Sequence, residues 1–172
     1  MSADHITTLD MPELIEKMHM VTAAGETFPL RVMGYSMNPT LGSTRDTVYL
    51  VSPEQRPPKK GEIVFFVRPD GRGVLHRLIR ILPDGNFLIN GDAQSWTENI
   101  CPDQIIAVVS RFERKNKKIS CDGRLYRVYV LLWEFLRPVR PTICSILRWF
   151  DGLQKKKGTS SSEQDGTEPR RQ

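Results

Sequence analysis

The sequence predicts a mainly β domain with a short helix before it and a helical segment after it. Short runs rich in Val, Ile, Leu and Phe recur between residues 28 and 122, separated by Gly, Pro and Asp. Helical patterns occur only near the two ends, and 172 residues allow one domain with a real core. We therefore expect four parts: a helical segment over 1–27, a β-rich domain over 28–122, a helical amphipathic segment over 123–153 and a disordered tail over 154–172.

The N-terminal helix is predicted from the stretch "DMPELIEKMHMVTAAG". Asp10 can accept a hydrogen bond from the first turn, and Pro12 suits the start of a helix, where its missing N–H costs nothing. Glu13 and Glu16 favour the positive N-terminal end of the helix. Gly25 is typical of the position that follows the last turn.

The strands are predicted from six runs: "FPLRVMG", "TVYLVS", "GEIVFFV", "VLHRLIRIL", "NFLING" and "QIIAVVSRFE". Two Asp-Gly dipeptides, at 70–71 and 84–85, are typical of tight hairpin loops. The segment "RKNKK", residues 114–118, predicts a further hairpin leading into "KISC". Several short strands joined by such turns indicate an antiparallel arrangement.

The C-terminal pattern "RLYRVYVLLWEFLRPVRPTICSILRWFDGL" is helical, with interruptions at Pro138 and Pro141. Its apolar run "VYVLLWEFL" is far shorter than the roughly 20 residues that span a bilayer, so we expect no transmembrane helix. Beyond residue 154 no side chain offers enough apolar surface to offset the entropy of ordering.

Charge is distributed unevenly along the chain. Residues 1–110 carry 10 Lys and Arg against 13 Asp and Glu, a balance of −3, whereas residues 111–172 carry 15 against 7, a balance of +8. A basic C-terminal third predicts an acidic partner, but no basic-aromatic pattern indicates specific nucleic-acid recognition.

The cysteines Cys101, Cys121 and Cys144 have no metal-like spacing, so we expect neither a metal nor an organic cofactor. Unpaired cysteines and the lack of a signal-peptide pattern favour a cytoplasmic location.

Three polar residues have the chemistry of a catalytic triad. Ser36 lies in "RVMGYSMNPTLG", a turn-prone stretch that leaves a strand; His76 lies inside "VLHRLIRI"; and Asp92 follows a strand in "LINGDAQSW". A serine, a histidine and a carboxylate can act as nucleophile, base and orienting group. Spacing alone does not show that they meet, because a triad is defined by geometry.

Four boxes in order give the pattern a specific resemblance. "GYSMNPTL", "KKGEIVFF", "VLHRLIRI" and "INGDAQ" resemble the G-x-S-M-x-P-T, G-D-I-V-x-F, K-R or H-R, and G-D boxes of the signal peptidase and self-cleaving repressor superfamily of serine peptidases. The histidine in the third box resembles the Ser-His signal peptidases of the endoplasmic reticulum and of sporulation, and the whole chain resembles small S24/S26-type peptidases without a membrane anchor. The resemblance implies their β fold.

Carried onto this chain, the resemblance makes Ser36 the nucleophile, with its backbone N–H in the oxyanion hole, and His76 the general base. Asp92 is favoured for a site role, while Glu98 is the rival group for orienting His76. Met37 and Pro39 of the first box are expected to contact the substrate, and Pro39 would stiffen the turn.

We therefore expect a serine endopeptidase that cleaves a peptide or a precursor protein with a leader-like segment through an acyl-enzyme. The alternatives are a self-cleaving repressor-type protease and a non-catalytic peptide-binding module of the same fold. The C-terminal segment either lies at a membrane surface or packs on the sheet or a partner. The oligomeric state is left open.

Overall fold

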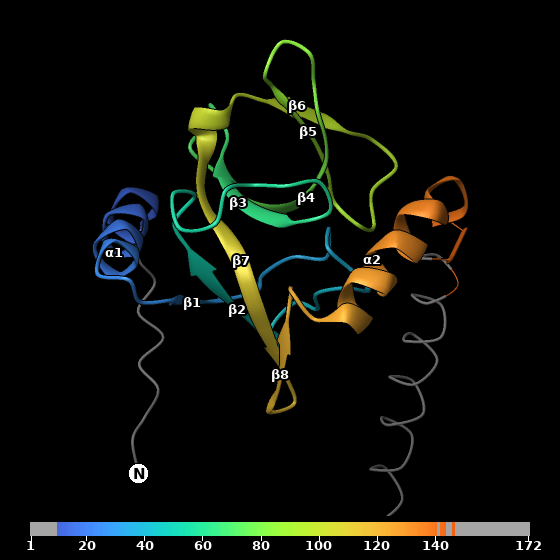
Figure 1. The fold of residues 1–172 in the computed structure, drawn as a ribbon, viewed down its shortest axis with the longest axis horizontal. Helices are drawn as coiled ribbons and strands as arrows, with labels where there is room; N and C mark the ends of the chain where they lie inside the picture. Colours follow the sequence, from blue (N-terminus) through green and yellow to red (C-terminus); the bar gives the residue numbers. More distant parts are fainter. Residues whose placement is uncertain (1–9, 141, 144–145, 147–172) are drawn as a thin grey trace, which may run out of the picture.

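The structure is a computed structural model that describes residues 10–140, 142–143 and 146. An antiparallel sheet forms its centre, with one helix on each side (Figure 1). The elements are α1 (Met11–Ala23), β1 (Phe28–Arg31), β2 (Asp46–Val51), β3 (Ile63–Val67), β4 (Gly73–Ile81), β5 (Phe87–Asn90), β6 (Glu98–Ile100), η1 (Pro102–Gln104), β7 (Ile105–Arg114), β8 (Lys117–Ser120), α2 (Arg124–Phe135) and η2 (Arg137–Val139). The predicted fold class is confirmed, while the expected tail over 154–172 lies outside the described residues.

β7 joins the two halves of the sheet. The strand order is β1-β2-β7-β3-β4-β5-β6, and β8 pairs with β7 as well. β7 is long enough to pair with β2 along its C-terminal part and with β3 along its N-terminal part, so that Val108 lies opposite both Val51 and Val64. Register shifts in both pairings bend the sheet.

The core lies on both faces of β3. Ile63 and Phe65 belong to one buried cluster, which includes Met18 of α1, whereas Val64 and Phe66 belong to the other. This follows from strand geometry, because successive side chains point to opposite faces. The uninterrupted apolar run "IVFFV" is therefore a strand with both faces covered.

The predicted N-terminal helix and the hairpins are confirmed. The Asp10 side chain accepts a hydrogen bond from the Glu13 N–H at 3.0 Å, and Gly25 after the helix has a φ of +81°. Both Asp-Gly hairpins close as expected, with glycine φ values of +80° and +84°. In the β7–β8 hairpin, Lys115 and Asn116 take the left-handed conformation that a two-residue hairpin loop requires.

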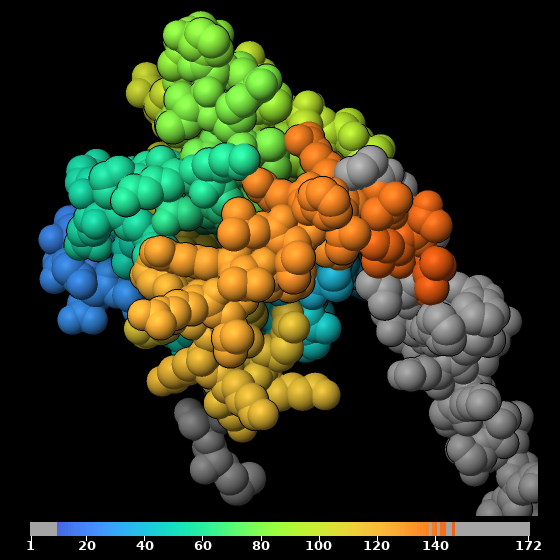
Figure 2. All heavy atoms as spheres, turned by 45° about the vertical axis from the view of Figure 1, so that its right-hand side comes forward, coloured from blue at the N-terminus to red at the C-terminus, as the bar shows by residue number. Residues whose placement is uncertain are grey.

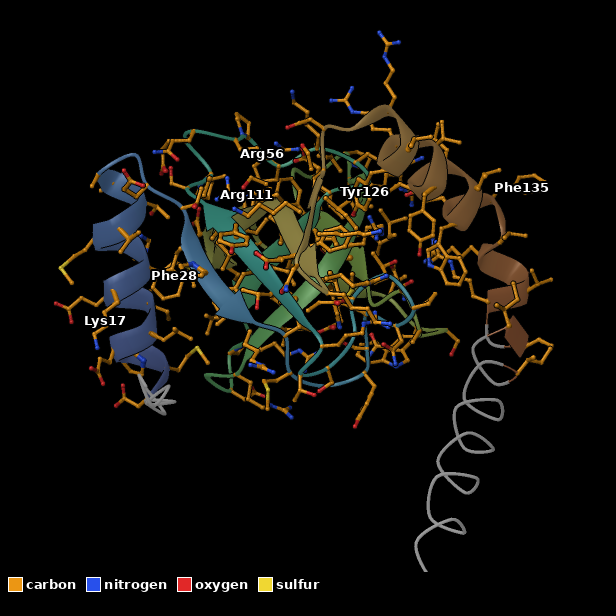
Figure 3. All side chains as sticks on the ribbon, turned by 90° about the horizontal axis from the view of Figure 1, so that it is seen from below. Lys17, Phe28, Arg56, Arg111, Tyr126 and Phe135 are labelled. Carbon is orange, nitrogen blue, oxygen red and sulfur yellow. The ribbon has the colours of Figure 1, made fainter. Side chains whose placement is uncertain are left out.

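α2 is fixed to the sheet by one face. Tyr126, Val130 and Trp133 are buried, and the ring of Tyr126 meets that of Phe112 edge-on at 5.8 Å. Figure 3 shows Tyr126 directed toward the sheet and Phe135 directed away from it. Within the described residues, no helix has the length and apolar character needed to cross a bilayer.

Candidate active site

Ser36 lies in the turn that follows β1, before the chain returns as β2. Its carbonyl oxygen accepts a hydrogen bond from the Ala93 N–H at 2.8 Å, so the loop after β5 is bonded directly to the backbone of the serine. Gly91 lets this loop approach closely, since a Cβ at that position would lie 2.7 Å from the Ser36 carbonyl oxygen. The first and fourth boxes of the sequence are thus in direct contact.

Ser36 and His76 line the same cleft, which has a volume of about 360 Å³. The turn after β1 and the strand β4 provide most of its walls, with further residues from α1, β1 and β3. Arg31, Arg68 and Gln94 add polar groups. The walls are otherwise largely apolar: Met11, Leu14, Leu30, Val32, Met33, Met37, Phe65, Val74 and Leu75. A cleft of this kind is suited to an extended peptide with apolar side chains.

His76 is buried beside two aromatic rings. It is only 1% exposed, its ring lies 5.9 Å from Phe66, and the indole of Trp96 meets it edge-on at 6.3 Å. Burial lowers the pKa of His76 to about 4, an effect that the nearby Glu98 carboxylate partly opposes and that Arg68 reinforces. At neutral pH the imidazole is therefore uncharged and able to accept a proton.

Glu98 is the carboxylate next to His76. Its Oε1 lies 3.1 Å from Nδ1 of His76, a short contact whose direction departs from a well-aligned hydrogen bond. Arg68 binds the same carboxylate through two hydrogen bonds of 2.6 Å and lies over the Trp96 ring. Arg68 and Trp96 were not foreseen from the sequence, where neither belongs to a box.

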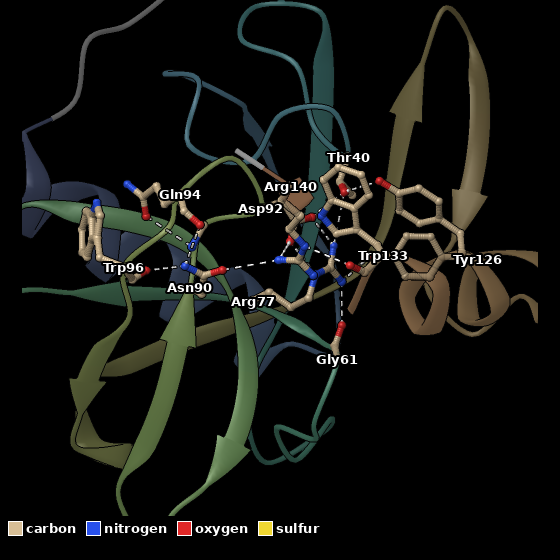
Figure 4. Close-up of polar contacts among 12 residues, drawn as sticks. Thr40, Gly61, Arg77, Asn90, Asp92, Gln94, Trp96, Tyr126, Trp133 and Arg140 are labelled. Atoms are coloured by element: carbon tan, nitrogen blue, oxygen red, sulfur yellow. Dashed lines mark hydrogen bonds and ion pairs between the residues drawn. The ribbon is translucent and has the colours of Figure 1, made fainter. Parts of the chain in front are cut away.

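Asp92 lies elsewhere, in a fully buried ion pair with Arg77 (Figure 4). The guanidinium donates to both carboxylate oxygens, at 2.8 and 2.6 Å. Burial by itself would lower the pKa of Arg77, but the Asp92 carboxylate raises it well above its ordinary value. The structure therefore brings Glu98, and not Asp92, to the imidazole.

Asp92 connects the serine loop to α2. The Thr40 hydroxyl, four residues after Ser36, donates to Asp92 and also contacts the Tyr129 hydroxyl at 2.7 Å. Arg140 lies 3.9 Å from the same carboxylate and donates to the Trp133 carbonyl at 2.9 Å. Thr40 belongs to the first box, but its role was not predicted, and the helical pattern of the C-terminal segment gave no sign of the polar contacts of Tyr129 and Arg140.

The backbone around the serine meets one requirement of an oxyanion hole. Gly34 has a φ of +82°, a conformation that glycine adopts readily, and its N–H donates to the Ser43 hydroxyl at 3.2 Å. The N–H of Ser36 has no hydrogen-bond partner within the described part of the chain. An unbonded backbone N–H next to the serine is the kind of donor that an oxyanion hole requires.

The two other predicted residues of the first box differ in position. Met37 is 2% exposed and lines the cleft from the core, whereas Pro39 is half-buried and lies outside the cleft lining. Among the described residues, no group of three His, Cys, Asp or Glu side chains is placed to hold a metal ion. Cys101 and Cys121 are free thiols, and Cys144 lies outside the described residues.

A comparison with models of known protein families gives a match for this chain. The family model described as Peptidase S24-like matches residues 4–113, which is more than half of the sequence and includes Ser36, His76, Asp92 and Glu98. No curated protein matches the chain.

Proposed function

Since the chain belongs to the S24-like peptidase family, we propose that it is a serine endopeptidase with Ser36 as nucleophile and His76 as general base. The observation that carries this proposal is the shared cleft, into which the turn after β1 brings Ser36 and β4 brings a buried, neutral His76. The boxes of the sequence thus come together around one concave site.

In the proposed reaction, the Ser36 hydroxyl oxygen attacks the scissile carbonyl carbon while its proton passes to Nε2 of His76. The N–H of Ser36 stabilises the oxyanion. When the C–N bond breaks, the imidazolium returns the proton to the leaving amine. A water molecule then attacks the acyl ester while His76 accepts its proton. His76 returns this proton to the Ser36 oxygen as the acyl C–O bond breaks, so the acid product leaves and the serine hydroxyl is regenerated.

Glu98 is the group we assign to orienting His76. In the tautomer we propose, the proton is on Nδ1, which lies 3.1 Å from Oε1 of Glu98, and the lone pair of Nε2 is left for the serine. The bidentate bond from Arg68 keeps Glu98 in place. Asp92 then acts through position alone, by holding Thr40 and hence the serine loop.

The substrate we propose is an extended segment of a peptide or precursor protein, such as a leader peptide. β1 is an end strand of the sheet order, and within the described part of the chain its one partner strand is β2, so its other edge can offer main-chain hydrogen bonds. The last two residues of this strand and the three that follow it, residues 30–34, also line the cleft. A Ser-His signal-peptidase type and a cytoplasmic location are part of the same proposal.

Covalent labelling tests the nucleophile. A fluorophosphonate probe should label the purified protein, and Ser36→Ala should remove the label. Ser95→Ala is the matched control, because Ser95 is exposed in the loop beside the cleft and does not line it. Labelling that survives in Ser36→Ala would show that another residue is the nucleophile. Absence of labelling in the parent protein would favour the non-catalytic binding module.

Self-cleavage is the alternative activity that family membership also allows. Mass spectrometry of the incubated, substrate-free protein distinguishes it from cleavage of a separate substrate. Under our proposal the mass of the chain stays constant. Fragments that appear in the parent protein and not in Ser36→Ala would instead indicate a self-cleaving protease.

A further inference from the structure

The outer face of α2 is an exposed apolar surface on an otherwise well-anchored helix. Five side chains form this surface, with exposed fractions from 53% to 89%: Leu125, Val128, Leu131, Leu132 and Phe135. Leu136 and Val139 of η2 extend it along the chain. Single exposed apolar side chains are common on protein surfaces, but a contiguous apolar surface of this kind usually marks an interaction site.

This exposure is not the result of a loosely placed helix. The opposite face of α2 packs on the sheet through Tyr126, Val130 and Trp133, and the Tyr129 ring stacks on Trp133 at 6.2 Å. Polar contacts from Thr40 and Arg140 fix the same side. The inner face is therefore occupied, and the outer face is available to a second surface.

Basic side chains surround this apolar surface. Figure 2 shows α2 across the front of the molecule with the β7–β8 hairpin below it. Exposed cations come from the hairpin, from the loop before β3 and from α2 itself: Lys115, Lys117, Lys118, Lys59, Lys60, Arg124 and Arg127. Two of these cations already have carboxylate partners: Lys60 pairs with Glu134, and Arg127 pairs with Asp122, which also binds Arg56. The three lysines of the hairpin, Lys59 and Arg124 supply the remaining positive charge.

We propose that α2 and the β7–β8 hairpin form a docking surface for a membrane that contains anionic lipid. Apolar side chains on one helix face can enter the boundary between headgroups and acyl chains, while flanking Lys and Arg side chains bind the negative headgroups. A second copy of the chain fits less well. A two-fold contact uses the same surface on both copies, so basic residues around the surface of one copy would face basic residues of the other.

The proposal does not depend on the peptidase assignment, and a vesicle-binding assay separates the two. The full chain is mixed with vesicles of phosphatidylcholine alone or of phosphatidylcholine with phosphatidylserine, and the bound fraction is measured by flotation. We expect flotation with the anionic vesicles and its loss in high salt, because added ions screen the headgroup charge. Ser36→Ala should bind as the parent protein does.

The apolar contribution is tested with the triple variant Leu125→Glu/Leu132→Glu/Phe135→Glu, which changes only exposed positions. We expect its partitioning to fall at least about ten-fold, since each change replaces an inserted apolar side chain by a charge. Met20→Glu is the matched control: Met20 is 60% exposed on α1, outside the proposed surface, and binding should persist. Circular dichroism verifies that each variant folds.

The basic contribution is tested with Lys117→Gln/Lys118→Gln. We expect partitioning onto the anionic vesicles to fall about five-fold for each cation removed. Lys17→Gln on α1 is its control. Unchanged flotation of the triple variant, or no binding by the parent protein to either vesicle, would overturn the proposal. So would a dimer in sedimentation experiments that the triple variant abolishes, because the surface would then serve a second copy.

Discussion

Substitution of Asp92 and of Glu98 should change different properties of the protein. A change at Asp92 should lower the folding stability, whereas a change at Glu98 should shift the pKa of His76. In Asp92→Asn the volume of the side chain is kept, but the fully buried Arg77 guanidinium loses its counter-charge. Breaking a buried ion pair by removing one partner costs about 3–5 kcal/mol. Since a domain is typically stable by about 5–15 kcal/mol, Asp92→Asn should lose a large part of its folding free energy.

Denaturant unfolding, followed by tryptophan fluorescence, measures this loss as a shift in midpoint. Glu98→Gln is the matched comparison: its pair with Arg68 is partly exposed, at 17% and 21%, so we expect a loss of about 1 kcal/mol or less. Glu98→Gln should instead move the acid limb of probe labelling to lower pH, because the Glu98 carboxylate raises the pKa of His76. Asp92→Asn should leave the position of that limb nearly unchanged.

Two results would refute the reasoning. A loss below about 1 kcal/mol in Asp92→Asn would mean that the buried Arg77 charge is not costly in its surroundings. A shift of the labelling limb in Asp92→Asn but not in Glu98→Gln would make Asp92 the orienting acid.

Two further predictions follow from burial and from close packing. His76 has a pKa of about 4 when folded and an ordinary value of 6.5, so it contributes stability that is fully present above pH 6.5 and is lost as pH falls toward 4. The difference corresponds to about 3 kcal/mol, and denaturant midpoints against pH should show it in the parent protein but not in His76→Leu. Gly91→Ala would press a Cβ against the Ser36 carbonyl oxygen, and we expect labelling to slow about 100-fold. Gly85→Ala, in a remote hairpin with a φ of +84°, should cost stability while the labelling rate stays the same.

The sequence predicted the elements whose signals are local. The capped helix at Asp10 and the turn at Asp84–Gly85 depend on a few neighbouring residues, and both are present. β6 was missed because its three residues, "ENI", contain one apolar side chain and are held only by pairing with β5. A helical segment was predicted over 123–153, and α2 occupies residues 124–135 of it. The contact between Tyr129 of α2 and Thr40 joins residues 89 positions apart and has no local signal.

The choice between the two carboxylates could not be made from spacing, although strand geometry explains it afterwards. His76 and Arg77 are neighbours in β4, so their side chains point to opposite faces of the sheet. Their partners on β3 show this, because Val64 opposite His76 and Ile63 opposite Arg77 belong to different core clusters. One carboxylate cannot reach both faces, so His76 and Arg77 are paired with different carboxylates, Glu98 and Asp92 respectively.

The division gives the two acids different tasks. On one face Glu98 lies beside the imidazole of His76, which is neutral at rest and accepts a proton in the proposed reaction. The Glu98 carboxylate is partly exposed, so solvent reaches its charge. On the other face Asp92 forms a fully buried ion pair with Arg77 and accepts a hydrogen bond from Thr40. These contacts hold the serine loop against β4 and α2. A single strand thus carries the proposed base on one side and, one residue later, Arg77 on the other, whose partner Asp92 holds the loop of the proposed nucleophile.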